Sequence, residues 1–300
     1  MKFIRDYELR IKSPGEIIGS KPDGSYIYDG KGKTVVINPP VSCTFDIDRA
    51  VMSSVNKGTI TLTNLAPDTR NAIYKDKYAT TEYWQCILMV GYGNELYEIF
   101  RGNIQEAYSY KSGTEWYTYI DCYDGSYAVQ NGFISETIGK GVSMKDAMAR
   151  VIHTMPEILE GIYGSPATTK TAPRGEVLLG NSWQELQRIT GGQASIDGEY
   201  INILAKDEAI SGDVFVLDSD MITETPKRRE QFLEVTTSVM CPEIRLYYIC
   251  QLKSLFTRYN GQYKVLGVKH SGTISGAQCG DATSMISLYK GEAPFTMVSK

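Results

Sequence analysis

The spacing of hydrophobic positions changes twice along this chain of 300 residues. Up to about residue 135, short β-branched or alternating runs are separated by Gly, Pro, Asn and Asp, and this pattern predicts strands. The clearest runs lie at residues 35–37, 43–47, 59–63, 104–110 and 115–123. The last two flank the sequence Lys-Ser-Gly-Thr and predict a hairpin. Several short strands with regular turn signals favour a barrel or a sandwich.

Hydrophobic residues then recur at helical spacing. Apolar positions from Met144 to Met155 repeat every three or four residues until Pro156, which predicts one amphipathic helix. Ser143 and Asp146 stand where a capping pair is expected at its start.

A second helix is predicted to start at Ser182, because Glu185 follows three residues later. The Gly-Gly pair at residues 191–192 predicts its end. The Asp-Gly pair at residues 197–198 lies between two short apolar runs and predicts a hairpin. In this interpretation residues 136–210 form a small α+β unit.

Strand-like runs return after residue 211. They lie at residues 214–217, 232–239, 244–252 and 262–268. The sequence thus predicts a mainly β fold with an α+β insert. Two barrel-like β domains, residues 1–135 and 211–300, flank a small helix-hairpin domain at residues 136–210. Two similar β units around one insert also suggest an ancient duplication.

Composition and charge argue against several classes of function. Hydrophobic residues make up 42% of the chain, enough for packed cores, and the net charge of −4 gives no basic surface for coating nucleic acid. The longest apolar run, residues 86–90, is far shorter than the roughly 20 residues that cross a bilayer. The N-terminus lacks the apolar core of a secretory signal. Six scattered cysteines indicate buried thiols in a reducing cytoplasm.

Two histidines offer candidate chemistry. His270 follows an apolar run, and its role as a catalytic base, as a metal ligand or as a residue without chemistry has to be weighed. A zinc site needs three or four ligands, but only His153 provides a second imidazole, on the polar face of its helix. Cys279 and Asp281 are the other candidate metal ligands close to His270 in sequence, but their spacing does not match that of paired ligands in known metal motifs. A structural or surface role for His270 is favoured.

Paired carboxylates are the second candidate. Asp46 and Asp48 lie on one face of a predicted strand, as do Asp121 and Tyr123, so a carboxylate pair for sugar hydrolysis is one hypothesis. Nothing in the sequence gives two carboxyls the different environments that an acid and a base need. A solvated strand face is the favoured interpretation.

Other segments carry weaker signals. Residues 28–33, Tyr-Asp-Gly-Lys-Gly-Lys, lack the spacing of a phosphate loop and predict a turn. Residues 226–230, Pro-Lys-Arg-Arg-Glu, form a basic cluster that is either a site for an acidic partner or a solvated loop, and the loop is favoured. An aromatic stripe is either a sugar platform or a packed strand pair, with packing favoured. It comprises Trp116, Tyr117, Tyr119 and Tyr123. The sequence predicts no catalytic, cofactor-binding or metal-binding residue.

Several segments, taken in order, resemble the central hub proteins of contractile phage-tail baseplates, which are related to the hubs of type VI secretion spikes. Residues 56–73 are similar to the hub signature in which a strand ends in Asn-Leu before Thr-Arg. Residues 90–107 resemble the next signature, an apolar-Gly-Tyr start that leads to Phe-Arg-Gly. The helix at residues 141–152 and the helix-hairpin module at residues 182–204 resemble the middle unit of the family.

Residues 224–246 and 260–272 resemble the terminal barrel of the same family, in which a Tyr-x-Val strand runs into His-x-Gly. The likeness spans about residues 34–290, and the order of its segments makes it specific. The chain departs from the family after Pro242, where Glu stands in place of the usual Gly.

The resemblance implies a structural baseplate hub without enzyme activity. Three copies would form a homotrimer in which two barrel-like domains per chain alternate in a pseudo-sixfold ring, an adaptor between the sixfold tail tube and the threefold spike. The implied partners are other copies of this chain, the tail tube protein and the central spike protein, with a tape-measure protein and baseplate wedge proteins as further candidates. His270 would be the wet end of a closing strand.

The implied location is the baseplate of the virion tail, after assembly in the host cytoplasm and without membrane contact. DNA would pass through the lumen without specific binding, because a mildly acidic wall repels phosphate. Two rival functions stay open. A tail-associated cell-wall hydrolase would use Asp46 or Asp121, and a glycan-binding module would lie within residues 1–135.

Overall fold

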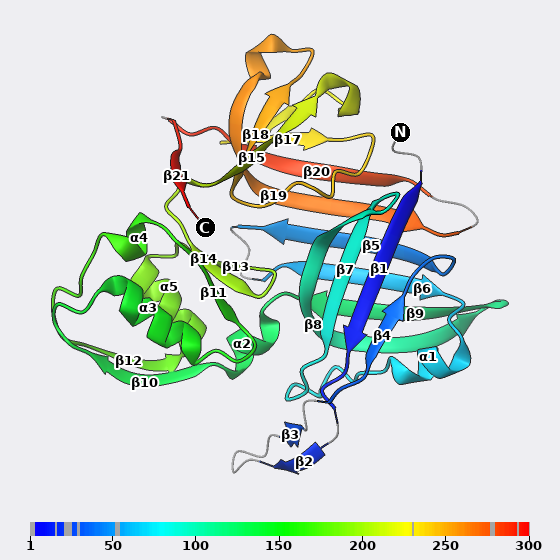
Figure 1. Cartoon of the computed structure of the whole chain (residues 1–300), viewed down its shortest axis with the longest axis horizontal. Coiled ribbons are helices and arrows are strands. Elements are labelled where there is room, and N and C mark those ends of the chain that lie inside the picture. Colours follow the sequence, from blue (N-terminus) through cyan, green and yellow to red (C-terminus); the bar gives the residue numbers. More distant parts are fainter. Residues whose placement is uncertain are drawn as a thin grey trace.

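The computed structural model describes residues 4–15, 17–20, 26–28, 31–51, 55–229, 231–276, 280–292 and 294–299. Most strands in this part of the chain join one sheet of 14 strands (Figure 1). The protein is therefore mainly β, as the hydrophobic pattern predicts. Every helix within these residues is too short or too polar to span a bilayer.

A first β unit contains strands in the order β5-β6-β9-β8-β7-β1-β4, and all neighbours are antiparallel. Its strands are β1 (Arg5–Lys12), β4 (Thr34–Ile37), β5 (Ser42–Ala50), β6 (Lys57–Thr63), β7 (Gln85–Tyr92), β8 (Glu95–Ser112) and β9 (Glu115–Tyr123). Burial alternates along them, so that in β5 Phe45 and Ile47 face the core while Asp46 and Asp48 face solvent. Helix α1 (Pro67–Ala72) connects β6 to β7, and β2 (Ile17–Ser20) pairs with β3 (Tyr26–Tyr28).

An α+β unit follows, drawn in green in Figure 1 beside the large sheet. Its elements are α2 (Ser126–Asn131), β10 (Phe133–Ile138), α3 (Met144–His153), β11 (Leu159–Tyr163), α4 (Ser165–Thr168), β12 (Glu176–Asn181), α5 (Ser182–Thr190), β13 (Ala194–Asp197) and β14 (Tyr200–Ile203). β10 pairs with β12, while β14 pairs with β11 and β13. The apolar faces of α3 and α5 meet in the core between these small sheets.

A second β unit closes the chain in the order β16-β17-β20-β19-β18-β15-β21. Its elements are β15 (Glu208–Asp218), η1 (Ser219–Met221), β16 (Lys227–Arg229), β17 (Phe232–Thr236), β18 (Tyr248–Lys253), η2 (Thr257–Tyr259), β19 (Gly261–Ile274), β20 (Ala282–Tyr289) and β21 (Thr296–Val298). β15 runs parallel to both β18 and β21.

The two β units repeat one strand path. The order β5-β6-β9-β8-β7 recurs as β16-β17-β20-β19-β18, with the same succession along the chain and the same antiparallel directions. The repeat stops at the outer strands, because β1 is antiparallel to β7 whereas β15 is parallel to β18. The shared path agrees with the duplication suggested by the sequence.

The long central strands of this path also correspond in register. Asn103 of β8 pairs with both β7 and β9, and Lys264 of β19 pairs with both β18 and β20. Two positions later, Gln105 and Leu266 are each the extra residue of a bulge, since the ladders skip from 104 to 106 and from 265 to 267. Because the two bulges occur at equivalent positions, the two units share the local backbone irregularity as well as the strand order.

β19 joins the two β units into one sheet. One edge of β19 pairs with β20. The other edge pairs first with β18 and then, over residues 267–274, with residues 43–50 of β5. Lys269 Nζ lies 3.1 Å from Asp46 Oδ2 across this β5–β19 junction. Ile47 and His270 are paired across it and fully buried. Backbone pairing therefore fixes how the second unit sits against the first.

Buried apolar side chains gather into three clusters. One lies in the first β unit, one in the α+β unit and one in the second β unit. The first cluster also takes in Met240, Ile274 and Ala282, which belong to the second β unit. The first core is thus completed by residues from the far end of the chain.

Both predicted helices form, but neither is capped by the side chain of the predicted serine. Ser143 precedes α3, but its side chain makes no capping hydrogen bond. At α5 the cap is Asn181, whose side-chain oxygen accepts from the backbone N–H of Gln184 at 3.1 Å. Ser182, the predicted cap, is already helical. Gly191 ends α5 as predicted, in a left-handed conformation with φ of 66°.

Strand prediction succeeds for most alternating runs and fails at some boundaries. Residues 244–252 become a strand only at Tyr248, because Tyr247 has φ of 70°. The predicted turn at residues 197–198 lies one residue later, at Gly198 and Glu199. Residues 227–229 of the predicted basic loop form the edge strand β16. The pattern analysis misses several strands, among them β1, β7, β10, β11, β12 and β20. Of these, β7 is a continuous apolar run rather than an alternating one.

Ile47→Ala tests the β5–β19 junction. Removing a fully buried side chain there is expected to lower the free energy of unfolding by about 2–5 kcal/mol, through lost burial and a residual cavity. Urea denaturation followed by circular dichroism measures the change. Asp48→Ala, on the exposed face of the same strand, is the control, with an expected change within about 0.5 kcal/mol. A loss below about 1 kcal/mol for Ile47→Ala would contradict a packed junction.

Candidate functional site

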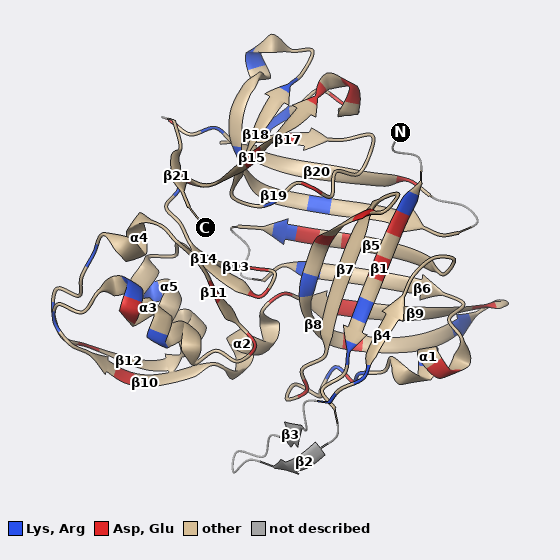
Figure 2. Ribbon diagram, in the orientation of Figure 1, with Lys and Arg blue, Asp and Glu red and all other residues tan. Residues whose placement is uncertain are grey.

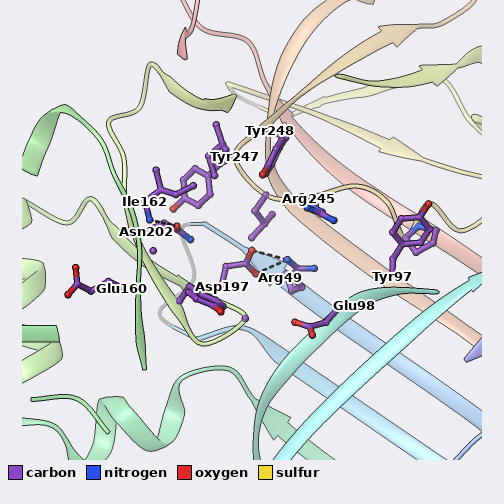
Figure 3. A pocket seen from close by; sticks show the side chains of 16 residues that line it. Arg49, Tyr97, Glu98, Glu160, Ile162, Asp197, Asn202, Arg245, Tyr247 and Tyr248 are labelled. Atoms are coloured by element: carbon purple, nitrogen blue, oxygen red, sulfur yellow. Dashed lines mark hydrogen bonds and ion pairs between the residues drawn. The ribbon is translucent and has the colours of Figure 1, made fainter. Parts of the chain in front are cut away.

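A hollow of about 560 Å³ opens where the α+β unit meets both β units (Figure 3). Its walls come from β5 and β8, from β11 and the β13–β14 hairpin, and from the segment before β18. Its charged and amide side chains are Arg49, Glu98, Glu160, Asp197, Asn202 and Arg245, and the rest of the lining is four tyrosines together with glycine and apolar residues. Residues distant in sequence thus converge on one place.

Arg49 and Asp197 form the central ion pair of this hollow (Figure 3). Arg49 Nε and Nη2 donate to the two carboxylate oxygens of Asp197 at 2.9 and 2.8 Å. Arg49 Nη1 also donates to the backbone carbonyl of Ile99 at 3.1 Å. The two charged side chains are only 12% and 16% exposed. A shielded bidentate pair is stronger and more directional than a surface pair, so it holds the hairpin firmly against β5.

Asp124 holds the turn of the same hairpin. Its carboxylate accepts from the backbone N–H groups of Gly198 and Glu199 at 2.7 and 2.8 Å, and from Asn56 Nδ2 at 3.2 Å. Burial, and then the nearby charge of Asp197, raises the pKa of Asp124 to about 7. The three donors favour the ionised form and limit this rise.

Further contacts bind the hairpin to the first β unit. Glu199 accepts hydrogen bonds from the Tyr83 hydroxyl and from Gln85 Nε2, the latter at 2.9 Å. Burial raises the pKa of Glu199. Asn56 Nδ2 donates to the carbonyl of Ile196 at 2.9 Å. The hairpin is therefore held to the first β unit along β13 and at its turn.

The second β unit contacts the α+β unit from the other side. Ser195 Oγ and the Tyr247 hydroxyl form a buried hydrogen bond. Lys264 Nζ donates to the carbonyls of Ala205 and Lys206 at 3.2 and 3.3 Å, just after the hairpin. Burial lowers the pKa of Lys264 to about 8. The β13–β14 hairpin thus lies between the two β units and bonds to both.

The geometry suits a rigid joint. Arg49 is paired with Asp197, Glu98 with Arg101, and Glu160 with His153 at 2.7 Å. The described residues contain no cluster of three or more His, Cys, Asp or Glu side chains that could hold a metal ion. Of these three pairs, Arg49–Asp197 joins two units, so it helps to fix how the α+β unit lies against the first β unit.

The structure corrects the position of His270. It lies inside β19 and is fully buried, rather than at the wet end of a strand. Nδ1 lies 2.8 Å from Ser284 Oγ, and Nε2 has no hydrogen-bond partner among the described residues. Burial, and then the charge of Arg49, lowers the pKa of His270 to about 3, so the imidazole is neutral. The equivalent pair in the first unit is Ser109 with Thr118, whose hydroxyls lie 2.9 Å apart.

His153, the other imidazole, does not lie at His270. His153 is exposed, as its helix position predicts, and pairs with Glu160 on the surface. Cys279 lies outside the described residues, so the proposed set with Asp281 has no geometry there. The predicted turn at residues 28–33 also lies partly outside them.

The candidate carboxylates lie on a solvated sheet face. Asp46 and Asp48 are both exposed on β5, as predicted. Asp46 contacts Lys269 at 3.1 Å, and Asp121 contacts Lys57 Nζ at 3.3 Å. Each of these two carboxylates therefore faces a cation across the strands.

The aromatic stripe packs across the β8–β9 hairpin. Tyr110 and Tyr117 stack with ring centroids 5.5 Å apart, and Tyr108 and Tyr119 lie 5.4 Å apart. These are cross-strand pairs of one ladder. Trp116 lies on the other face of β9, apart from these tyrosines.

Sequence reasoning missed Arg49, Asn56, Asp124 and Asp197 as site residues. It weighed the aspartates of Phe-Asp-Ile-Asp-Arg but not the arginine, and treated Asp197 only as a turn residue. No spacing rule relates these positions, because the contacts arise only when three units pack. One signal was present, since Asn56 begins the first hub-like segment.

Comparison with known proteins identifies the fold. No protein-family model and no curated protein matches this chain. A tail protein from Neisseria meningitidis MC58 is similar over 96% of this chain and 97% of its own, with a TM-score of 0.58 and 10% identity. The 43 kDa tail protein of prophage MuSo2 from Shewanella oneidensis is similar over 94% and 97%, with a TM-score of 0.55 and 9% identity. The chain has the fold of phage tail proteins.

A secretion-system protein has a similar structure. Escherichia coli protein c3393 is a component of the type VI secretion system, with structural similarity to the bacteriophage T4 tail proteins gp27 and gp5. It is similar over 86% of this chain and 76% of its own, with a TM-score of 0.54 and 9% identity. These neighbours support the sequence resemblance at the level of a tail-protein fold.

Arg49→Ala tests the central ion pair. The variant is expected to lose about 3–5 kcal/mol of unfolding free energy, because Asp197 stays shielded beside Asp124 without its cation. The double variant with Asp197→Ala should lose less than the sum of the single variants. Arg101→Ala, which breaks a more exposed pair, should cost under about 1 kcal/mol. Additive losses in denaturant unfolding would argue against the pair.

His270→Asn tests the buried imidazole by its pH dependence. Below its unfolded pKa of 6.5, His270 takes up a proton in the unfolded state but stays neutral when folded, until about pH 3. The parent should therefore lose stability relative to the variant by about 1.4 kcal/mol per pH unit as pH falls through this window. Taking the difference between the two proteins cancels the opposite contribution of Asp124. A difference that does not change with pH would contradict the assignment.

Proposed function

We propose that this chain is the structural hub of a phage tail baseplate. In this proposal three copies form a pseudo-sixfold ring that adapts the sixfold tail tube to the threefold spike. The tail-protein fold supports it, because the similarity covers nearly the whole of both chains in two comparisons. The α+β joint holds the two β units of each copy in one fixed relation.

The observation that carries the proposal is the repeated strand path of the two β units. Two similar units in each of three chains give six similar positions around one axis, while the whole chains keep threefold symmetry. One face of such a ring matches a sixfold tube and the other a threefold spike. We propose that the three domains predicted at residues 1–135, 136–210 and 211–300 make up this ring subunit, with the α+β domain beginning at α2 and the last domain at β15.

The charge distribution suits a conduit. Figure 2 shows basic and acidic residues interspersed over the large sheet. On β5 and β19 this mixture includes the pair Asp46–Lys269. With a net charge of −4, such a surface does not concentrate phosphate, so we propose that DNA passes without specific binding. The chain then acts as a virion tail component rather than as an enzyme, with the tube and spike proteins as partners.

Light scattering and electron microscopy of the purified protein test this function. The expected mass is about 100 kDa, three times the 33.4 kDa of one chain, and averaged images should show a ring of six lobes. A stable monomer at every concentration, or a twofold assembly, would refute the ring. Tight binding of duplex DNA at physiological salt would refute only the conduit.

A further inference from the structure

We infer that the edge of β16 in one copy pairs with the edge of β8 in the next, and that this contact repeats between chains the β5–β19 junction found within each chain. The inference deepens the proposed function and rests on it, because it names the contact that closes the ring. Its partner is a second copy of this chain.

Both edges lack a strand neighbour among the described residues. β16 stands at the end of the strand path with only β17 beside it. On β8, pairing with β7 ends at Asn103. Beyond it, among the described residues, Ile104 donates its N–H to the Trp84 carbonyl and Lys75 bridges Ala107 on that edge. Ala107 exchanges both backbone hydrogen bonds with Lys75, at 2.9 and 3.0 Å. Because strand residues alternate in direction, the N–H and C=O groups of Ser109 and Lys111 point to the same edge.

The internal repeat shows which strand fits each edge. In the repeated path β16 corresponds to β5, and β8 corresponds to β19. Within the chain, the outer edge of β5 is covered by the part of β19 that follows the bulge at Leu266. The part of β8 that follows the equivalent bulge at Gln105 offers the same kind of edge, and β16 is the strand of the β5 type that has no strand on its outer side among the described residues.

The register transfers as well. When β16 of one copy is aligned with β8 of the next as β5 is aligned with β19 within one chain, Arg229 lies opposite Tyr108 and Lys227 lies opposite Tyr110. The intrachain pairs that set this register are Asp48 with Lys269 and Asp46 with Ser271. Each copy offers one edge of each kind, so the contact is head-to-tail, and with the threefold rotation of the proposed hub it closes a ring of three.

The side chains suit this contact. Tyr108 and Tyr110 are 39% and 44% exposed on a hairpin that extends from the sheet, and the side chains of Lys227 and Arg229 are 65% and 74% exposed. A cation placed over the face of a tyrosine ring is attracted to that ring, and the attraction is stronger where the contact excludes water. A cation–tyrosine ladder would thus stand where the intrachain junction has its Lys269–Asp46 ion pair.

Cysteine cross-linking tests the register. In a Cys279→Ser background, Tyr108→Cys and Arg229→Cys are combined and the protein is oxidised under non-reducing conditions. Directly opposed strand residues have Cα separations of about 4.5–5.5 Å, within the range of a disulfide. The double variant should give covalent dimers and trimers on a gel, and neither single variant should give trimers. Leu179→Cys with Arg229→Cys is the control, since Leu179 is 63% exposed but lies on β12, away from both edges.

Ser109→Pro blocks the edge itself. Proline removes the N–H that points to the neighbouring copy and leaves the hydrogen bonds to β9 in place. The trimer dissociation constant measured by light scattering should rise at least tenfold, with an unchanged circular dichroism spectrum. Ser109→Ala, which keeps the N–H, should stay trimeric.

The outcomes separate the two proposals. A trimer that survives Ser109→Pro and gives no covalent species from the double-cysteine variant overturns this contact and leaves the ring standing. A parent chain that stays monomeric at all concentrations overturns both. Cross-linked trimers from the double variant but not from its control support both.

Discussion

Backbone pairing between β5 and β19 is the constraint on which the rest of the molecule depends. The ladder covers eight residues on each strand, which lie more than 200 positions apart in sequence. Each hydrogen bond contributes only about 1 kcal/mol net, but together they fix distance, direction and register at once. Because the register is fixed, Ile274 and Ala282 reach the first core, and Lys264 lies where it can bond to the end of the β13–β14 segment.

Polar contacts in shielded surroundings complete that arrangement. The β13–β14 hairpin carries Asp197 to Arg49, offers its turn amides to Asp124, and places Ser195 beside Tyr247. Such contacts are directional and costly to break when water is excluded, so they favour one relative placement of the units over many. Apolar packing alone would permit more sliding between the same surfaces.

Local patterns predicted the local structure, and tertiary pairing explains the failures. Alternation identified β5, β6 and β9, and helical spacing identified α3 and α5, because these signals come from residues that are neighbours along the chain. The clearest failure is His270: a run that ends in a polar residue resembles a strand end, but β5 and β20 cover it on both sides. Arg49 and Asp124 were missed for the same reason, since their partners lie in other units.

The brevity and charge of β16 have a consequence for how copies recognise each other. Two copies of Lys-Arg-Arg laid edge to edge would set like charges against one another, and such pairs destabilise a sheet. Self-pairing by this strand is therefore disfavoured, and a short cationic edge is also a poor template for runaway stacking. In the isolated subunit, these three residues therefore disfavour pairing of β16 with the same strand of another copy.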